Sequence, residues 1–348
     1  MPLEEPSWWY GAAGGSHLAE RLLSPISDLY GRVVERRFKA VQPFRCGLPV
    51  ICVGNFTAGG TGKTPLTRFL VSMLAGDGVT PVCLTRGYGG SLAGPVWVAP
   101  ERHSAGEVGD EPLLIARTAR VMISRDRKAG LAAIAASEGV EIVIMDDGLQ
   151  NPSLAKDLSI AVVDAGRGFG NGRVIPSGPL RARLDFQLGL VDCIVVMGAD
   201  PPEGPSPIFE ELKKRFPGPV LRGAVAPTGD CGWIAGKSLL AYAGIANPER
   251  FFRLLESFGP DRLVRRTFPD HHAFTEGEAA GLIAEAKALG ADLVTTEKDL
   301  ARLAGGSGAP GELASLSRTL PIEVQFDDRD LVRLRSLVDG VLKGAARG

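Results

Sequence analysis

One segment, residues 53–65 (VGNFTAGGTGKTP), constrains the fold of this chain more than any other. An apolar stretch that ends at Gly54 runs into a glycine-rich turn, and Lys63 and Thr64 then open a segment of helical pattern. Glycines let a backbone curl with its N–H groups pointing inward, and the partial positive charge of a helix N-terminus strengthens such an anion-binding nest. The segment therefore predicts a strand, a phosphate-binding turn and a helix, as in P-loop nucleotide-binding proteins.

The turn supplies the groups that a triphosphate and its metal ion need. Its cradle consists of Thr57, Ala58, Gly59, Gly60, Thr61, Gly62, Lys63 and Thr64. The Lys63 ammonium group can reach the β- and γ-phosphates of ATP, and the Thr64 hydroxyl can ligate Mg²⁺. The usual pattern G-x-x-x-x-G-K-[ST] starts with glycine, whereas this chain has Thr57 there, so the match is incomplete. We interpret the turn as a nucleotide site rather than as a tight structural turn.

Apolar segments of strand length alternate with helical segments along most of the chain. The expected strands of the first part cover residues 49–54, 81–85, 121–124, 141–145, 160–164 and 193–197. Strands that are apolar throughout and alternate with helices indicate a parallel sheet covered on both faces. We therefore predict an α/β fold with a P-loop NTPase-like parallel sheet, plus a smaller second α/β domain.

Proline and glycine concentrate over residues 200–235, which suggests a domain boundary. We expect a core over residues 46–215 and the smaller domain over 216–348, with a last helix that can pack back on the core. The clearest helix of the second part covers 275–289, with Thr275 as N-cap and Glu278 completing a capping box. Further strands are expected at 239–243, 263–268, 293–295 and 322–326, and further helices at 248–258 and 328–342.

Acidic residues follow a second apolar strand in EIVIMDDGLQ, residues 141–150. Asp146 and Asp147 would lie at the carboxyl end of that strand, where ligands bind in parallel sheets. With the phosphate turn upstream, a metal-binding role is favoured over an ordinary turn at a strand end. Asp110 and Glu111 lie in GDEPLL just before a helix, and there the spacing alone favours helix capping over catalysis.

Histidine and arginine residues on loops are further candidates. His271 follows Asp270 in FPDHHAF, where a polar turn and a contact with a base or a phosphate both remain open. Tyr88 lies in TRGYGG, and Arg173 and Arg181 lie in GNGRVIPSGPLRAR. Guanidinium groups at the edge of a sheet suit phosphate recognition, but a solvent-facing loop explains them equally well.

The N-terminal part contains a helical pattern that we expect to begin with Ser24 as N-cap and Pro25 at the first helical position. Its apolar residues recur at three- and four-residue steps, and basic residues gather near its end. A helix packed on its own domain is slightly favoured by the pattern alone. The alternative is a helix lying on anionic lipid, with Trp8, Trp9 and Tyr10 at the interface.

Charge and cysteine content exclude several classes of protein. Lys and Arg number 39 and Asp and Glu 40, a balance that argues against a general nucleic-acid binder. The five scattered cysteines fit a reducing compartment. No stretch approaches the ~20 apolar residues that a membrane-spanning helix needs.

The chain carries seven motifs in a fixed order: GNFTAGGTGKTP, TRGYGG, GDEPLL, MDDGLQ, GNGRVIPSGPLR, FPDHHAF and TTEKD. Each is modest alone, but their joint order over roughly residues 40–300 is specific. It resembles the tetraacyldisaccharide 4′-kinases of lipid A synthesis, a family that tolerates a residue other than glycine at the position of Thr57.

The resemblance implies a role for each matching residue. Lys63 and Thr64 match the phosphate-loop pair, Asp110 matches the base that receives the hydroxyl proton, and His271 matches its supporting partner. The residues implied around the metal ion are Thr64, Glu111, Asp146 and Asp147. Those implied near the substrate or the nucleotide are Tyr88, Gln150, Arg173 and Arg181.

The resemblance also implies a reaction and a place in the cell. The reaction is ATP- and Mg²⁺-dependent transfer of the γ-phosphoryl group to the 4′-hydroxyl of an acylated glucosamine disaccharide 1-phosphate. Residues 1–45 become a membrane-associating segment, peripheral or monotopic, at the cytoplasmic face of the bacterial inner membrane. No nucleic acid and no obligate protein partner are expected.

One alternative function is a P-loop ATPase or GTPase switch that acts on a partner protein. A GTPase needs a guanine-reading N/TKxD loop, and TTEKD at residues 295–299 has the wrong spacing for it. A lipid-binding scaffold with a decayed loop is a third class, and the intact Lys63, Thr64 and acid pair argue against it.

Overall fold

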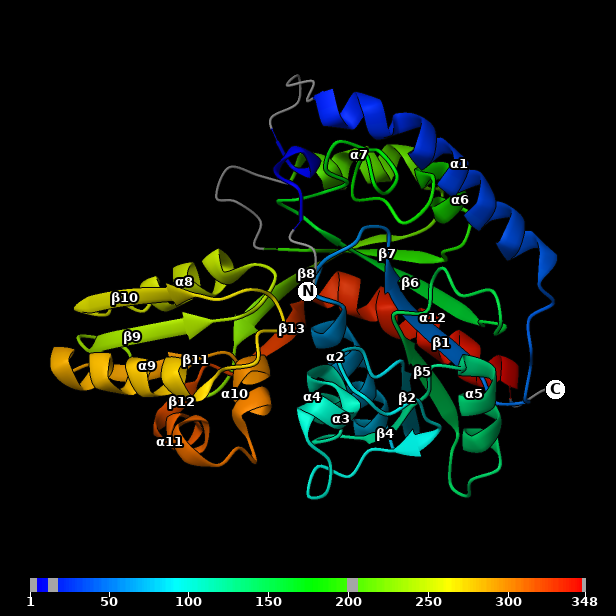
Figure 1. The fold of residues 1–348 in the computed structure, drawn as a ribbon. Coiled ribbons are helices and arrows are strands. Elements are labelled where there is room, and N and C mark those ends of the chain that lie inside the picture. The colour runs from blue at the N-terminus through cyan, green and yellow to red at the C-terminus, as the bar shows by residue number, and fades with distance from the viewer. Residues whose placement is uncertain (1–4, 12–17, 199–205, 346–348) are drawn as a thin grey trace.

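The computed structural model describes residues 5–11, 18–198 and 206–345, and Figure 1 shows them as two units, each built around one sheet. The larger sheet has nine strands in the order β13-β8-β7-β6-β1-β5-β2-β4-β3. Its strands are β1 (Val50–Asn55), β2 (Pro81–Thr85), β3 (Val96–Trp97), β4 (Arg120–Ile123), β5 (Ile142–Asp146), β6 (Leu158–Asp164), β7 (Cys193–Met197), β8 (Val220–Pro227) and β13 (Ile322–Phe326).

The smaller sheet has four parallel strands in the order β10-β9-β11-β12. They are β9 (Ser238–Ala243), β10 (Arg262–Thr267), β11 (Asp292–Thr295) and β12 (Ser317–Thr319). The helices are α1 (Leu18–Ala40), α2 (Lys63–Gly76), α3 (Ala105–Val108), α4 (Asp110–Ile115), α5 (Arg127–Ala135), α6 (Leu184–Leu188), α7 (Pro207–Arg215), α8 (Pro248–Glu256), α9 (Glu276–Leu289), α10 (Glu297–Leu303), α11 (Gly308–Leu316) and α12 (Asp328–Ala345), with a 3₁₀ turn at Ser7–Trp9.

The larger sheet is parallel except at its two edges, as the apolar strands predict. Only β3 and β13 run antiparallel to their neighbours among the described strands. β1 is buried along its whole length and lies between β5 and β6, with Val53 opposite Asp146 and Gly54 opposite Ala161. This register places the end of β1, where the glycine-rich turn begins, beside the acidic end of β5.

Alternate residues of β1 face two separate cores. Ile51 and Val53 pack with Leu66 and Leu70 of α2, and α12 lies in the same layer through Leu334. The opposite face contains Val50 and Cys52 with residues of α5, α6 and α7. Helices therefore cover both faces, the arrangement that fully apolar parallel strands require.

The smaller sheet is also covered on both faces. Leu239 and Ala241 of β9 pack against α8, and Leu240 and Tyr242 pack against α9 and α11. α9 begins with the expected capping box, in which Thr275 accepts from the backbone N–H of Glu278. In Figure 1 this unit lies to one side of the larger sheet.

The division expected at residue 216 does not follow the sheets. β8 pairs with β7 and β13 pairs with β8, so both belong to the larger sheet, and α12 packs there as well. The smaller sheet runs from residue 238 to 319. We did not predict α7 and β8, which lie in the proline- and glycine-rich run. β8 contains residues of weak strand propensity and ends at Pro227.

The expected start of the N-terminal helix is wrong. α1 begins at Leu18, and Pro25 lies inside it rather than at its first position. Proline within a helix removes one backbone hydrogen bond. Two residues later the Ser27 hydroxyl donates to the carbonyl of Leu23 at 3.2 Å. Residues 1–4 and 12–17 of the expected membrane-associating segment lie outside the described residues.

Candidate active site

The phosphate loop begins at the end of β1 and closes on the first residue of α2. Gly62 is the N-cap of α2 at φ 90° and Gly59 has φ 93°, left-handed conformations that favour glycine. The loop is braced from outside, because Ala58 donates its N–H to Pro179 O at 2.8 Å and Arg181 Nε donates to Thr57 O at 3.0 Å. The sequence pattern of the turn thus corresponds to a curled backbone at a helix N-terminus.

Two buried polar atoms at this loop have no hydrogen-bond partner among the described residues. They are Asn55 Oδ1 and Thr61 Oγ1. Asn55 and Thr61 are 0 % and 6 % exposed, and the amide of Asn55 donates to Thr57 O at 2.8 Å. Buried polar groups are nearly always paired, so the loop has unused hydrogen-bonding capacity. The Thr61 hydroxyl, which can donate, the two left-handed glycines and the adjacent lysine fit a bound nucleotide phosphate.

Lys63 lies between the loop and the acidic end of β5. Its Nζ is 3.7 Å from Asp147 Oδ1, and Arg181 binds both oxygens of Asp147 at 2.7 and 3.1 Å. Burial lowers the pKa of Lys63, against the charge of Asp147. Burial acts in the opposite sense on Asp147, but the charges of Lys63 and Arg181 hold its pKa well below the usual range. Asp147 therefore remains a carboxylate.

The charges of three acids, Asp147, Glu111 and Asp146, act on this lysine. Burial, followed by the charges of Glu111 and Asp147, raises the pKa of Asp146 to about 7. The Thr67 hydroxyl of α2 donates to Asp146 Oδ1 at 2.9 Å. No group of three or more His, Cys, Asp or Glu side chains within the described ranges is arranged as a metal cluster. The oxygen donors nevertheless fit Mg²⁺, which retains several waters and takes one or two carboxylates.

Asp110 and His271 meet across the two units. Asp110 begins α4, and His271 Nδ1 lies 3.3 Å from its Oδ2. Asp110 is 3 % exposed and His271 has φ 57°, an uncommon conformation for a residue other than glycine. Burial would raise the pKa of Asp110, but the hydrogen bond from His271 and the charge of Arg302 hold it well below its usual range. The same hydrogen bond raises the pKa of His271.

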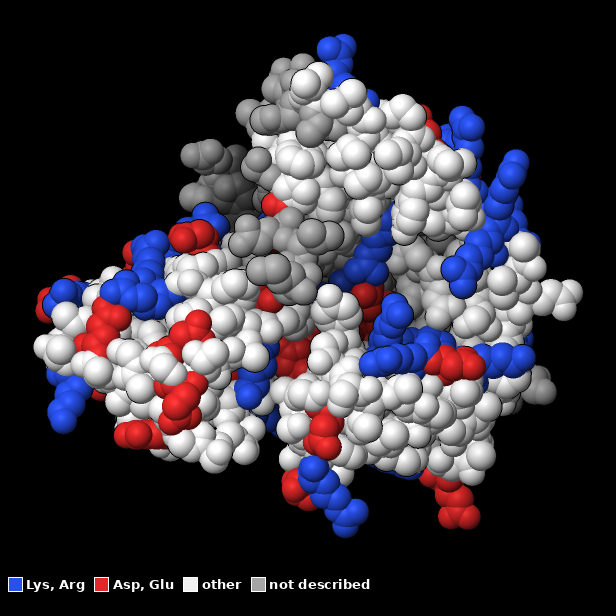
Figure 2. All heavy atoms as spheres, viewed as in Figure 1, with Lys and Arg blue, Asp and Glu red and all other residues white. Residues whose placement is uncertain are grey.

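Two basic residues of α10 were not predicted as site residues. Arg302 donates to Asp110 Oδ2 through Nε at 2.8 Å and through a terminal nitrogen, and Lys298 binds Glu111. Figure 2 shows basic and acidic side chains meeting in the hollow between the units. The signal in the sequence is the i,i+4 spacing of Lys298 and Arg302, which places both on one helix face.

Of the remaining predicted residues, Tyr88 and Gln150 lie at the site and Arg173 lies away from it. Tyr88 lies edge-on to His271 with ring centroids 5.3 Å apart. Gln150 donates to Asn55 O at 2.6 Å and to the side chain of Gln187, a partner that we did not predict. Arg173 is instead tied to α1, where it binds Glu20 at 2.6 Å and Ser24 at 3.0 Å.

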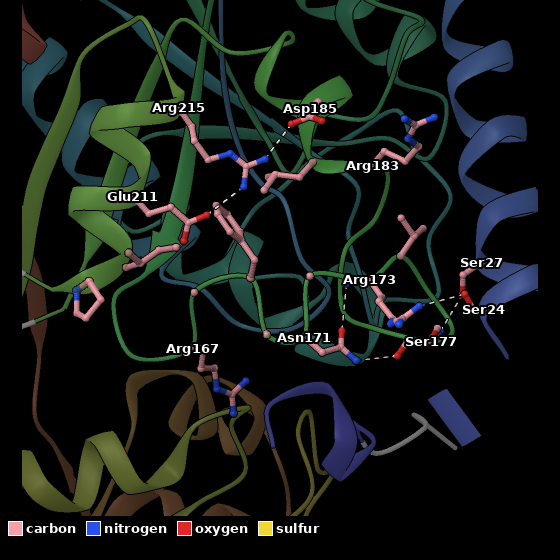
Figure 3. Close-up of a pocket in the computed structure, with 18 of the residues that line it drawn as sticks. Ser24, Ser27, Arg167, Asn171, Arg173, Ser177, Arg183, Asp185, Glu211 and Arg215 are labelled. Carbon is pink, nitrogen blue, oxygen red and sulfur yellow. Dashed lines mark hydrogen bonds and ion pairs between the residues drawn. The ribbon is translucent and has the colours of Figure 1, made fainter. Parts of the chain in front are cut away.

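Arg173 lines a pocket of about 770 Å³ between α1 and the loop that follows β6 (Figure 3). In that view Arg173 points toward Ser24, and Arg215 points toward Glu211 and Asp185. Dashed lines join both Arg173 and Arg215 to other residues drawn there. Arg173 therefore connects α1 to the core rather than joining the Lys63 cluster.

Two of the three aromatic residues near the N-terminus, Trp9 and Tyr10, contact the body of the protein. Trp9 is 8 % exposed, and its indole nitrogen donates to Pro176 O at 3.1 Å. The Arg167 guanidinium lies over the ring of Tyr10 at 4.9 Å and pairs with Glu5 at 2.9 Å. Trp9 therefore does not fit the expected lipid contact, whereas for the partly exposed Trp8 and Tyr10 that contact stays a prediction.

A glycine-rich loop between a central parallel strand and a helix, faced by acids from the neighbouring strand, defines a P-loop nucleotide-binding protein. The Asp110–His271 pair places a carboxylate and an imidazole in contact across the two units. The fold and site together are those of a P-loop phosphotransferase.

Comparison with known proteins gives the family. Residues 19–339 match the model of the tetraacyldisaccharide-1-P 4′-kinase family. The tetraacyldisaccharide 4′-kinase of Bradyrhizobium diazoefficiens is 45% identical over 97% of this chain and 96% of its own, and that of a Methylobacterium species is 46% identical over 97% and 98%. The chain belongs to the tetraacyldisaccharide 4′-kinase family and is a kinase, so the switch and scaffold alternatives are not supported.

A solved structure has the same fold. The crystal structure of LpxK from Aquifex aeolicus in complex with ATP matches with a TM-score of 0.70 at 24% identity. The match covers 93% of this chain and 100% of that one. The predicted α/β fold is therefore confirmed in both units.

Proposed function

We propose that this kinase transfers the γ-phosphoryl group of ATP to the 4′-hydroxyl of an acylated glucosamine disaccharide 1-phosphate. One observation carries the proposal: Asp110 from the larger unit and His271 from the smaller unit meet at 3.3 Å, beside the acids that face the phosphate loop. The names of the 4′-kinase relatives support the proposed acceptor lipid, and the unpaired Thr61 hydroxyl, which can donate to a phosphate oxygen, supports a phosphate in the loop.

The residues that would hold ATP and Mg²⁺ lie on β1, α2, α4 and β5. The loop amides and Lys63 would hold the phosphates, and Thr64, Glu111, Asp146 and Asp147 are the proposed oxygen donors to Mg²⁺ or its waters. Bound Mg²⁺ would neutralise charge that develops on the transferring group. The buried Asp146 favours a nearby divalent cation, since after burial it is the negative charges of Glu111 and Asp147 that raise its pKa.

Asp110 is the proposed general base. Its low pKa keeps it in the carboxylate form, which can accept the hydroxyl proton as the oxygen attacks. His271 would help to orient Asp110, because its Nδ1 donates a hydrogen bond to Asp110 Oδ2. Because the pair joins the two units, the base is complete only when the units are together, which would help to exclude water and limit ATP hydrolysis.

We also propose that α1 lies on the inner-membrane surface at its cytoplasmic face. None of the helices in the described part of the chain is long and apolar enough to cross a membrane. The outer face of α1 is an apolar stripe in which Leu18, Leu22, Ile26, Leu29 and Val33 are 53–73% exposed. In Figure 2 the surface over α1 is mostly white, with basic side chains projecting along its edge.

The inner face of α1 makes several polar contacts in addition to the packing of Phe38 on Phe186 of α6, whereas the inner face of an ordinary surface helix is apolar. Ser27 is 3 % exposed and accepts from the Ser177 N–H at 2.9 Å, Glu20 binds Arg173, and Glu35 lies 3.7 Å from Arg183. A helix that directs its leucines outward and has basic residues beside them suits an anionic lipid surface. The acceptor, an acylated lipid, would be reached from that surface without a protein or nucleic-acid partner.

The test is a phosphoryl-transfer assay with acylated disaccharide 1-phosphate, [γ-³²P]ATP and Mg²⁺. Asp110→Ala should lower turnover by ~10²–10⁴, the usual contribution of a general base, while ATP binding stays nearly intact. Lys63→Ala should impair both ATP binding and turnover. Unchanged turnover in Asp110→Ala would exclude Asp110 from the role.

A further inference from the structure

One short helix of the smaller unit carries three charged contacts to the larger unit. On α10, Glu297 binds Arg68 of α2 at 2.9 Å, Lys298 binds Glu111, and Arg302 binds Asp110. The three partners lie on the helix that follows the phosphate loop and on the helix that begins with the proposed base. α10 therefore contacts the elements that position the phosphates and the base.

Arg302 is the most buried of these contacts. Its side chain is 8 % exposed and that of Asp110 is 3 % exposed. Nε donates to Asp110 Oδ2 at 2.8 Å, and one terminal nitrogen donates to the same oxygen. The other terminal nitrogen donates to Gly244 O at 2.6 Å and to Asp299 Oδ1 at 2.7 Å. The guanidinium is thus fixed on both sides.

The groups behind Arg302 are themselves held in place. Asp299 is fully buried, accepts from the Gly244 N–H at 3.1 Å and accepts from the Thr296 hydroxyl at 2.6 Å. A planar guanidinium with fixed donors sets the orientation of a carboxylate in a way that a flexible ammonium cannot. Arg302 consequently transmits the geometry of the smaller unit to Asp110.

The other contacts of Asp110 are either local or longer than those from Arg302. Oδ1 accepts the N–H of the next residue, Glu111, at 2.9 Å, which is a local contact within one unit. The His271 side chain, which is 24 % exposed, contacts Oδ2 at 3.3 Å. The two shorter contacts to Oδ2 both come from Arg302.

We propose that Arg302 is a positioning residue for phosphoryl transfer: it orients the Asp110 carboxylate from the opposite unit and acts on the reaction through that carboxylate. The proposal rests on the proposed role of Asp110 as the base. Arg302 lies behind Asp110, with its donors on Asp110, Asp299 and Gly244 O, so it affects turnover and not nucleotide binding.

The experiment is a double-mutant cycle in the full chain, with phosphoryl transfer to acylated disaccharide 1-phosphate as the readout. Arg302→Ala should lower kcat by ~10²-fold, the cost of a misplaced catalytic group, and leave the KM for ATP within about threefold. Arg302→Lys should recover part of the lost kcat because it keeps the charge without the fork. In an Asp110→Asn background, Arg302→Ala should lower kcat by less than about threefold, because the two residues act as a unit.

A matched control is Arg266→Ala, which removes an exposed arginine of the same unit that pairs with Glu285. It should leave kcat unchanged, and the melting temperature of each variant shows whether it folds. If Arg302→Ala does not fold, the cycle is run with Arg302→Lys, whose smaller loss of kcat should likewise vanish in the Asp110→Asn background.

Two results would overturn the proposal. One is an unchanged kcat in folded Arg302→Ala and Arg302→Lys. The other is a loss of kcat that persists in full in the Asp110→Asn background. If Asp110→Asn alone retained wild-type kcat, the proposed base itself would be wrong, which is a different outcome from failure at Arg302.

Discussion

The terminal nitrogens of Arg181 lie 2.7 and 3.1 Å from the two carboxylate oxygens of Asp147. Through Nε the same arginine donates to Thr57 O at 3.0 Å. One side chain thereby joins the acidic end of β5 to the first residue of the phosphate loop. Asp147 in turn lies 3.7 Å from the Lys63 ammonium group, so Arg181 helps to fix the position of both charges.

Replacing this fork should impair catalysis. Arg181→Lys should lower kcat by about 10- to 100-fold, because a hydrogen bond to a charged group contributes ~1.5–3 kcal/mol and a lysine cannot bind both oxygens. Arg183→Lys is the control, since Arg183 is exposed and faces Glu35 of α1. Steady-state kinetics in detergent micelles provides the measurement. Wild-type kcat in Arg181→Lys would show that the fork has no catalytic role.

Removing the unpaired hydroxyl of Thr61 should have opposite effects on protein stability and on ATP binding. Thr61→Val should leave the unliganded protein equally stable or more stable, because a buried hydroxyl without a partner is costly. The same change should weaken ATP binding by about 10-fold if a phosphate oxygen accepts this hydroxyl's hydrogen bond. Urea unfolding and isothermal titration calorimetry measure the two quantities. Unaltered ATP affinity would remove Thr61 from the nucleotide site.

The Asp110–His271 contact predicts a pH-dependent contribution to stability. The contact raises the pKa of His271 in the folded state above its unfolded value of ~6.5. The stabilisation from protonated His271 is therefore fully present below pH ~6.5 and is lost as the pH rises through the folded-state pKa.

The difference in unfolding free energy between the wild type and His271→Gln should accordingly be larger at pH 6 than at pH 9. NMR titration of the His271 ring, assigned with the same variant, should give a pKa above ~6.5. A value below this, or a stability difference that does not change with pH, would contradict the assigned contact.

The apolar stripe of α1 can be tested with lipid vesicles. Leu22→Glu combined with Leu29→Glu should reduce co-sedimentation with anionic vesicles at least tenfold, because each leucine loses ~1.5–3 kcal/mol of burial and each glutamate adds repulsion. Val332→Glu is the control, since Val332 is 65 % exposed on α12. Equal loss of binding in both proteins would remove α1 as the lipid-binding element.

The sequence predicts strands well where apolar residues form an uninterrupted run. β7 and β13 have the predicted bounds, 193–197 and 322–326, and β1 differs from its prediction by one residue at each end. β8 was missed because proline and glycine surround it, and its place in the larger sheet depends on pairing with β7. Such pairing between distant segments leaves no local signal in the chain.

The candidate site shows the same limit. The conformation of Gly59 and Gly62 follows from the turn pattern, because the curled backbone needs residues without a Cβ. The contacts of Arg302 with Asp110 and of Lys298 with Glu111 join segments nearly 200 residues apart, |i−j| 192 and 187. Spacing within α10 indicates a charged helix face, and only the fold identifies its partners.

The most direct test of the account is to identify the product of the wild-type enzyme. Purified protein is incubated with acylated glucosamine disaccharide 1-phosphate, ATP and Mg²⁺, and the lipid is analysed by mass spectrometry and ³¹P NMR. The account predicts one added phosphate, as a monoester on the 4′-hydroxyl, and no transfer by Lys63→Ala. Recovery of unmodified lipid while ATP is hydrolysed, or a phosphate on a different hydroxyl, would contradict it.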